Sequence, residues 1–264
     1  MADFTAKDVQ ALRQATGAGM MDAKKALTEN DGDFDTAAKW LREKGLAKSV
    51  ERSGRDNIDG AVAVAVAGAA VALVEIKCET DFVAKSDLFT PVVAELAAQV
   101  AEQGEGAVTA AADRIDDLKV TLKENIEVGR VVRFEVADGD VLDTYLHTQE
   151  GRGKVAVAVE LAGGTPELAH DIALHIAFAK PRFLSRDEVD ATAVADERET
   201  LTAITRAEGK PEQDIDKIVE GRLTAWFQTQ VLLEQKFVKD EKQTISQALG
   251  GASIVRFAVV AVGS

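Results

Sequence analysis

The apolar stretch AVAVAVAGAAVALVEIKC, at positions 61–78, constrains the fold more than any other part of the chain. Residues 61–66 and 71–76 alternate or run apolar and are rich in valine, which is typical of strands. Between them, AGAA with Gly68 is typical of a turn. The stretch therefore predicts a β-hairpin. It also falls short of the roughly 20 uninterrupted apolar residues that a membrane helix needs.

Downstream of this hairpin, the spacing of apolar residues changes to that of a helix. Six residues share one helical face: Phe89, Val92, Val93, Leu96, Ala97 and Val100. A further helix is expected over residues 110–124, and RVVRFEV at 130–136 is typical of a strand. Together these elements predict an α+β subdomain over residues 60–140.

The same pattern then recurs. KVAVAVELAGG, which begins at Lys154, resembles the first hairpin, and a helix is expected around residues 168–179. Near the end, SIVRFAVV at 253–260 echoes RVVRFEV. We therefore expect a second, related subdomain over residues 141–264. The predicted fold class is α+β, with antiparallel sheets in both subdomains.

The second copy is longer than the first, and its extra residues lie at about 186–230. Apolar residues at helical spacing predict a helix in the second half of this insertion: Ile215, Ile218, Val219, Leu223, Trp226 and Phe227. EGKPEQ at 208–213 is typical of a turn. The insertion therefore predicts a helical hairpin, a short coiled coil, whose first helix has the thinner apolar stripe. Such a hairpin needs a partner surface within the chain or on another subunit.

The first 48 residues predict a small bundle of three helices. TGAG at 16–19 and ENDGD at 29–33 separate the helices, and Gly45 is expected to end the third. The polar, aperiodic segment 49–59, SVERSGRDNID, predicts a linker. A bundle of this size has a thin core and little stability of its own.

Composition argues against several classes of function. The net charge is −14, so the average surface repels phosphate backbones and direct nucleic-acid binding is not expected. A single cysteine, Cys78, excludes an intrachain disulfide and fits a reducing compartment. The first residues, MADFTAKDVQ, lack the pattern of a signal peptide. We expect a cytoplasmic protein with no membrane association.

No group of residues predicts catalysis, a cofactor or a metal site. Cys78 ends an apolar strand and is expected to be a small buried side chain. His175 lies on the apolar face of its predicted helix, which indicates a core or interface histidine. It is five residues from His170, whereas two metal ligands on one helical face are four apart. No carboxylate pair stands out as an acid–base couple. We therefore expect a binding protein rather than an enzyme.

Three long motifs carry a resemblance to a known family. They are LRQATGAGMMDAKKALTENDGD at 12–33, CETDFVAKS at 78–86 and KPEQDIDKIVEGRL at 210–223. In order and spacing they resemble the elongation factor Ts family of bacteria, over nearly the whole chain. The resemblance implies an N-terminal bundle of the ubiquitin-associated type, two related α+β subdomains, and a helical hairpin inserted in the second.

The resemblance also implies a function. Members of the family are guanine nucleotide exchange factors for elongation factor Tu, the GTPase that delivers aminoacyl-tRNA. They bind its GDP-bound form, promote GDP release by disturbing the site that holds Mg²⁺ and phosphate, and leave when GTP binds. No catalytic group or cofactor of their own is required. In some relatives the hairpin pairs two copies, so homodimerisation through it is a further expectation.

The resemblance assigns three groups of contact residues. The motif that reaches the Mg²⁺ site of the GTPase corresponds to Thr80, Asp81, Phe82 and Val83. The N-terminal module contributes Arg13, Met20 and Met21. The second subdomain contributes Val155, Ala156, Val157, His175, Phe237, Val238 and Lys239.

Some positions depart from the family pattern or leave an alternative open. Members often have Ile-Gly-Val where this chain has residues 155–157, and a methionine where it has Lys239. A C-terminal helix that some members pack on the GTPase is not expected here. Without the resemblance, Phe82 would be assigned to the core and Met20 to the helical stripe. The alternative function is an adaptor or scaffold without exchange activity.

Overall fold

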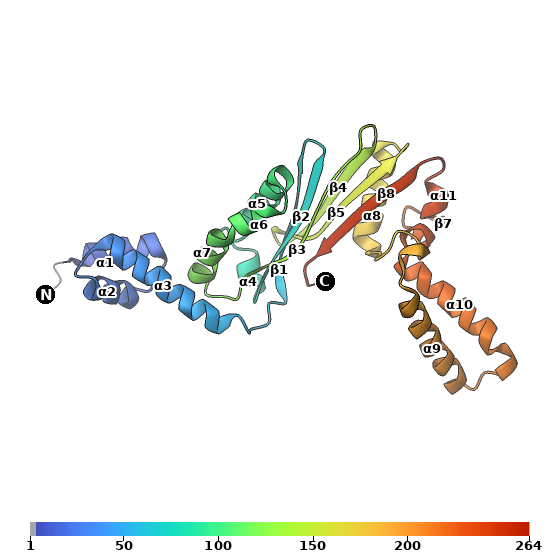
Figure 1. Cartoon of the computed structure of the whole chain (residues 1–264), viewed down its shortest axis with the longest axis horizontal. Coiled ribbons are helices and arrows are strands. Elements are labelled where there is room, and N and C mark those ends of the chain that lie inside the picture. Colours follow the sequence, from blue (N-terminus) through green and yellow to red (C-terminus); the bar gives the residue numbers. More distant parts are fainter. Residues whose placement is uncertain (1–3, 264) are drawn as a thin grey trace. The chain divides into compact units, whose positions relative to one another are not determined.

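The computed structural model describes residues 4–263. Met1, Ala2 and Asp3 of the predicted first domain, and Ser264 of the last, lie outside the described residues. Helices and small sheets both contribute to the fold (Figure 1), which confirms the α+β class. The chain forms two compact units. One comprises Met1–Phe134, Thr148–Val155 and Val260–Ser264, and the other comprises Glu135–His147 and Ala156–Val259.

The N-terminal segment forms the predicted three helices. These are α1 (Ala6–Thr16), α2 (Met20–Glu29) and α3 (Phe34–Arg52). Gly17 ends α1 with φ 67°, a left-handed conformation that glycine adopts without strain. A small apolar core joins the helices: Val9, Leu12, Ala23, Ala26, Leu27, Ala37 and Leu41. The likeness to ubiquitin-associated domains stays a prediction.

The expectation that Gly45 ends the third helix was wrong. Helix α3 continues to Arg52, through the first part of the segment expected to be a linker. Gly45 lies where α3 packs on α7 (Ala112–Leu122). A β-carbon at Gly45 would meet the side chain of Val120 at 2.6 Å. The glycine permits a close helix–helix approach here and does not stop the helix.

The predicted hairpin is the centre of the first unit. Strands β1 (Asp59–Ala67) and β2 (Ala70–Cys78) pair antiparallel from Asp59–Cys78 to Ala67–Ala70, and Gly68 turns between them with φ 60°. The third strand of this sheet is β3 (Glu127–Glu135), in the order β1-β2-β3.

Helices cover one face of this sheet. Helix α5 (Thr90–Gln103) packs on β1 and β2, and the short α6 (Gly106–Ala110) links it to α7 (Figure 1). The predicted apolar face of α5 is buried, from Phe89 to Val100. Helix α4 (Asp81–Ala84) is a single turn directly after β2. The covered sheet provides a rigid base at the end of β2.

The second sheet has the order β4-β5-β8, and most of its residues belong to the second unit. Its strands are β4 (Val141–Gln149), β5 (Arg152–Ala162) and β8 (Ser253–Ala261). KVAVAVELAGG, which resembles the first hairpin in sequence, lies in one continuous strand, β5, and its next residues. The predicted helix is α8 (Pro166–Ala179). A 3₁₀ turn at Arg186–Glu188 precedes the hairpin, and a second one at Leu232–Glu234 follows it. Between that second turn and β8 lie β6 (Lys236–Phe237), β7 (Asp240–Thr244) and α11 (Ile245–Ala248).

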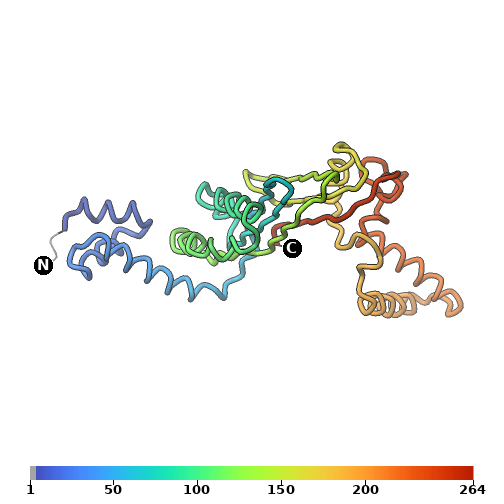
Figure 2. Tube along the Cα trace, turned by 45° about the horizontal axis from the view of Figure 1, so that its top comes forward, coloured from blue at the N-terminus to red at the C-terminus, as the bar shows by residue number. Residues whose placement is uncertain are grey.

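The predicted helical hairpin consists of α9 (Ala191–Ala207) and α10 (Glu212–Gln230), which run side by side (Figure 2). Helix α10 buries the expected stripe: Ile215, Val219, Leu223 and Phe227. On α9 the buried residue is Thr205, while Ile204 is 45% exposed. The base of the hairpin is an apolar cluster that includes Val189, Leu223, Phe227 and Val231.

Residues after β8 return to the first unit. The N–H of Val262 donates to the carbonyl of Lys154 at 3.0 Å. The N–H of Gly263 donates to Oε1 of Glu75, a fully buried carboxylate on β2, at 3.2 Å. The N–H of Arg130 donates to the other oxygen of Glu75 at 3.2 Å. Backbone N–H groups of Arg130 on β3 and of Gly263 therefore donate to both oxygens of this buried side chain.

Within the part of the chain that the structure describes, no helix combines the length and apolar character needed to cross a membrane.

Candidate functional site

The Thr-Asp-Phe-Val motif lies where β2 ends and α4 begins. Thr80 is the N-cap of α4, and its hydroxyl accepts a hydrogen bond from the N–H of Val83 at 3.4 Å. The next residue but one, Phe82, points its ring into solvent and is 77% exposed. Phe82 is therefore not part of the core, and its role in partner contact stays a prediction.

Lys85 contacts both side chains of the Asp81–Phe82 pair. Its ammonium donates to Asp81 Oδ2 at 2.9 Å and lies 5.1 Å from the centre of the Phe82 ring. The hydrogen bond from Lys85 lowers the pKa of Asp81. A second carboxylate, that of Glu150, lies 3.7 Å from the same ammonium. The motif thus presents an aromatic ring beside an ionised carboxylate.

Sequence analysis assigned no role to Lys85, although a signal was present. Lys85 follows Asp81 at i+4, the spacing that brings an acidic and a basic side chain together on one face of a helix.

Cys78, directly before the motif, is fully buried, as expected. Burial raises the pKa of its thiol to about 12, so the thiol stays protonated near neutral pH. Its Sγ donates to the carbonyl of Thr80 at 3.3 Å. The cysteine supports the turn and is not prepared as a nucleophile.

The predicted contact residues of the N-terminal module lie at the surface of the bundle. Met21 is 74% exposed and Met20 is 47% exposed, although Met20 shares a helical stripe with buried Ala23 and Leu27. Arg13 is exposed in the last turn of α1. Two neighbouring methionines form an adaptable apolar surface.

The predicted contact residues of the second subdomain divide into exposed and buried ones. Val238 is 49% exposed, and the side chain of Lys239 is 65% exposed and pairs with Asp171. Buried positions form the other group: Val155, Ala156, Val157, His175 and Phe237. Because β5 is the middle strand of its sheet, residues 155–157 offer neither side chains nor a free strand edge to a partner.

His175 holds the turn that carries Val238. Its Nδ1 accepts the N–H of Val238 at 3.3 Å, so Nε2 carries the proton and donates to Oε1 of Gln235 at 2.9 Å. The ring also meets Phe237 edge-on, with centres 6.1 Å apart. Burial lowers the pKa of His175. The expectation of a core or interface histidine agrees with this geometry.

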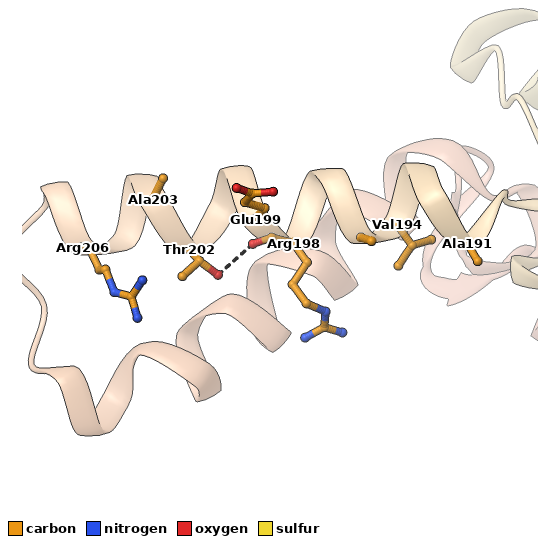
Figure 3. A pocket seen from close by; sticks show the side chains of 8 residues that line it. Ala191, Val194, Arg198, Glu199, Thr202, Ala203 and Arg206 are labelled. Carbon is orange, nitrogen blue, oxygen red and sulfur yellow. Dashed lines mark hydrogen bonds between the residues drawn. The ribbon is translucent and has the colours of Figure 1, made fainter.

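A shallow groove runs along one face of α9 (Figure 3). It is lined by Ala191, Val194, Ala195, Arg198, Glu199, Thr202, Ala203 and Arg206. The Thr202 hydroxyl donates to the carbonyl of Arg198 at 2.8 Å (Figure 3), and both arginines form ion pairs with α10. The two cationic groups of the lining are therefore already paired within the hairpin. Among residues 4–263, no three His, Cys, Asp or Glu side chains gather as metal ligands would.

Comparison with known proteins gives one consistent result. The model of the family described as "Elongation factor TS" matches residues 79–264. The chain is 43% identical to elongation factor Ts of Acidothermus cellulolyticus, over 100% of this chain and 99% of the relative. It is 43% identical to that of Cutibacterium acnes, over 98% and 99% of the two chains. It is 39% identical to that of Deinococcus radiodurans, again over 98% and 99%.

Proposed function

The chain belongs to the elongation factor Ts family of translation elongation factors, and we propose on this basis that it is the guanine nucleotide exchange factor for elongation factor Tu. It binds the GDP-bound GTPase, promotes release of GDP, and remains on the nucleotide-free form until GTP binds. The setting proposed for this cycle is the cytoplasm, without direct contact to nucleic acid or membrane. The net charge of −14 supports the exclusion of nucleic acid.

The observation that carries the proposal is the exposure of Phe82 beside Asp81. A large apolar ring that is 77% exposed at the end of a rigid strand has no role in the core of its own chain. It suits insertion into a partner, because an aromatic side chain has little rotamer entropy to lose on binding. Asp81 is ionised and suited to accept hydrogen bonds from backbone N–H groups of the partner.

We call the exposed Phe82 ring the wedge. Its effect on nucleotide exchange follows from the thermodynamic linkage between partner binding and GDP binding. A factor that binds the nucleotide-free GTPase more tightly than the GDP-bound form must weaken GDP binding by the same ratio. The wedge needs only to displace the element that positions Mg²⁺, because loss of the metal charge loosens the phosphates of GDP. No catalytic group of this chain takes part in the step.

Two further surfaces complete the proposed contact. Met20, Met21 and Arg13 dock the N-terminal bundle, and Val238 and Lys239 dock the second unit. His175 and Phe237 act there by holding the Val238 turn, as their burial and hydrogen bonds support.

The test is release of a fluorescent GDP analogue from purified elongation factor Tu, with and without this protein. Acceleration that depends on the concentration of the chain supports the proposal. Tight binding without any acceleration would favour the adaptor function instead.

A further inference from the structure

The turn before Asp81 is held by a residue 44 positions away, Glu124. Helix α7 ends at Leu122, and Lys123 follows in a left-handed conformation with φ 60°, which directs the chain toward the end of β2. Oε2 of Glu124 accepts the N–H of Glu79 at 2.9 Å and the N–H of Thr80 at 3.1 Å. Oε1 accepts the hydroxyl of Thr80 at 2.5 Å. One carboxylate thus receives three hydrogen bonds from two successive residues.

These bonds fall where the β-ladder no longer constrains the chain. The pairing of β1 with β2 ends at Asp59–Cys78, so Glu79 and Thr80 lie beyond it. A reciprocal bond strengthens the connection, because Oε1 of Glu79 accepts the N–H of Asn125 at 2.7 Å. Charge-assisted hydrogen bonds of this kind are stronger than neutral ones. The position of α4 is therefore set from two sides, by β2 and by the end of α7.

We propose that Glu124 is a positioning residue for nucleotide exchange, which fixes the turn before α4 so that Asp81 and Phe82 meet the partner in one geometry. The inference rests on the proposed function. It also gives Thr80 a role different from partner contact. Its hydroxyl donates to Glu124 and accepts from Val83, so it is occupied within the chain. A side chain and turn that are ordered before binding lose less conformational entropy when the partner binds.

The first experiment compares three variants in the GDP-release assay at saturating exchange factor. In Glu124→Ala all three hydrogen bonds are lost, and we expect a maximal release rate about 10-fold lower, as for loss of hydrogen bonds to a charged group. In Glu124→Gln the amide oxygen still accepts the two N–H groups and its NH₂ donates to Thr80, so the rate stays near that of the parent. The control is Glu127→Ala, because Glu127 is exposed and its carboxylate bonds only the Asn57 side chain among the contacts resolved for it. That variant should exchange at the parental rate.

A second experiment separates positioning from general stability. In the Phe82→Ala background, Glu124→Ala should slow release little further, because the wedge it positions is already gone. In the free protein, Glu124→Ala should also speed amide hydrogen exchange at Glu79 and Thr80, while amides of β1 and β2 keep their protection.

The outcomes are distinguishable. If the parent does not accelerate GDP release at all, the proposed function fails, and the positioning role with it. If the parent is active and Glu124→Ala is equally active, Glu124 is not a positioning residue. The same conclusion follows if the effects of Glu124→Ala and Phe82→Ala are fully additive, or if Glu124→Gln is as slow as Glu124→Ala.

Discussion

A β-carbon added at Gly45 of α3 would lie 2.6 Å from Cγ1 of Val120 on α7. In an open helix, Gly→Ala stabilises by about 1 kcal/mol, but overpacking at a close contact costs about 1–3 kcal/mol. We predict that Gly45→Ala destabilises the parent, whereas in a Val120→Ala background it stabilises by about 1 kcal/mol. The four proteins are the parent, the two single variants and the double variant. Chemical denaturation of each gives the change in the free energy of unfolding caused by Gly45→Ala in both backgrounds. The same sign in both backgrounds would contradict this packing.

The misassignment at Gly45 shows what local sequence can and cannot predict. The strands β1 and β2, the helix α5 and the helical hairpin follow from periodicity, because burial within a regular element repeats along the chain. A glycine such as Gly45 is typical of a helix end when only its neighbours in sequence are considered. Its actual packing partner, Val120, is 75 residues away along the chain. The sequence of strand β4, VLDTYLHTQ, does not predict a strand, because its apolar and polar residues come in pairs and do not alternate. All its residues remain partly or fully exposed.

The candidate site was predictable to a similar extent. The position of Phe82 after an apolar strand suggests a turn, but its exposure needed the structure. No local pattern identifies Glu124, because its three hydrogen-bond donors belong to Thr80 and Glu79, which lie 44 and 45 residues away. The resemblance assigns residues 155–157 to the partner contact, but their side chains are buried. The predicted contact therefore has no exposed side chain at these positions.

Truncation of the wedge is the direct test of the proposed mechanism. We predict that Phe82→Ala retains the parental melting temperature, because its ring is exposed, and loses about 2 kcal/mol of transition-state stabilisation, roughly a 30-fold slower GDP release. Asp81→Ala should lose less. The matched control is Val66→Ala, an exposed apolar residue at the opposite end of the same hairpin. Parental release by a folded Phe82→Ala protein would exclude Phe82 as the wedge.

The N-terminal docking surface predicts a change in affinity without a change in stability. Met21→Ala should weaken binding to nucleotide-free elongation factor Tu by about 1 kcal/mol, roughly 5-fold, with an unaltered circular dichroism melt. Val50→Ala serves as the control, since Val50 is 72% exposed on α3 and is not assigned to the contact. Equal affinities of all three proteins in a binding titration would remove Met21 from the interface.

The buried His175 predicts a pH dependence of stability. Its pKa in the folded chain lies below the ordinary 6.5 because burial disfavours the charged ring. The unfolded chain therefore takes up a proton first as the pH falls through about 6.5, and the free energy of unfolding decreases below that pH. His175→Gln should flatten the slope between about pH 7.5 and 5.5. Denaturation midpoints across this pH range measure the slope, and a variant with the parental slope would contradict the assignment to His175.

The hairpin predicts self-association that is separable from exchange. Replacing residues 195–222 with a short Gly/Ser bridge keeps the apolar base at Val194, Leu223 and Phe227. It removes Ile204, the exposed apolar residue of α9. We expect unchanged GDP release and less self-association in sedimentation velocity. A folded truncated protein that no longer promotes release would place the hairpin within the mechanism.

The presence of residues 260–263 in the first unit sets a condition on the order of folding. The N–H groups of Val262 and Gly263, which bond Lys154 and the buried Glu75, are translated after every residue of the second unit. Until then Glu75 lacks one of its hydrogen-bond donors. Domains commonly fold in the order of their synthesis. In this chain the unit that begins first also contains the last residues, so its native contacts cannot be completed before the second unit has been synthesised.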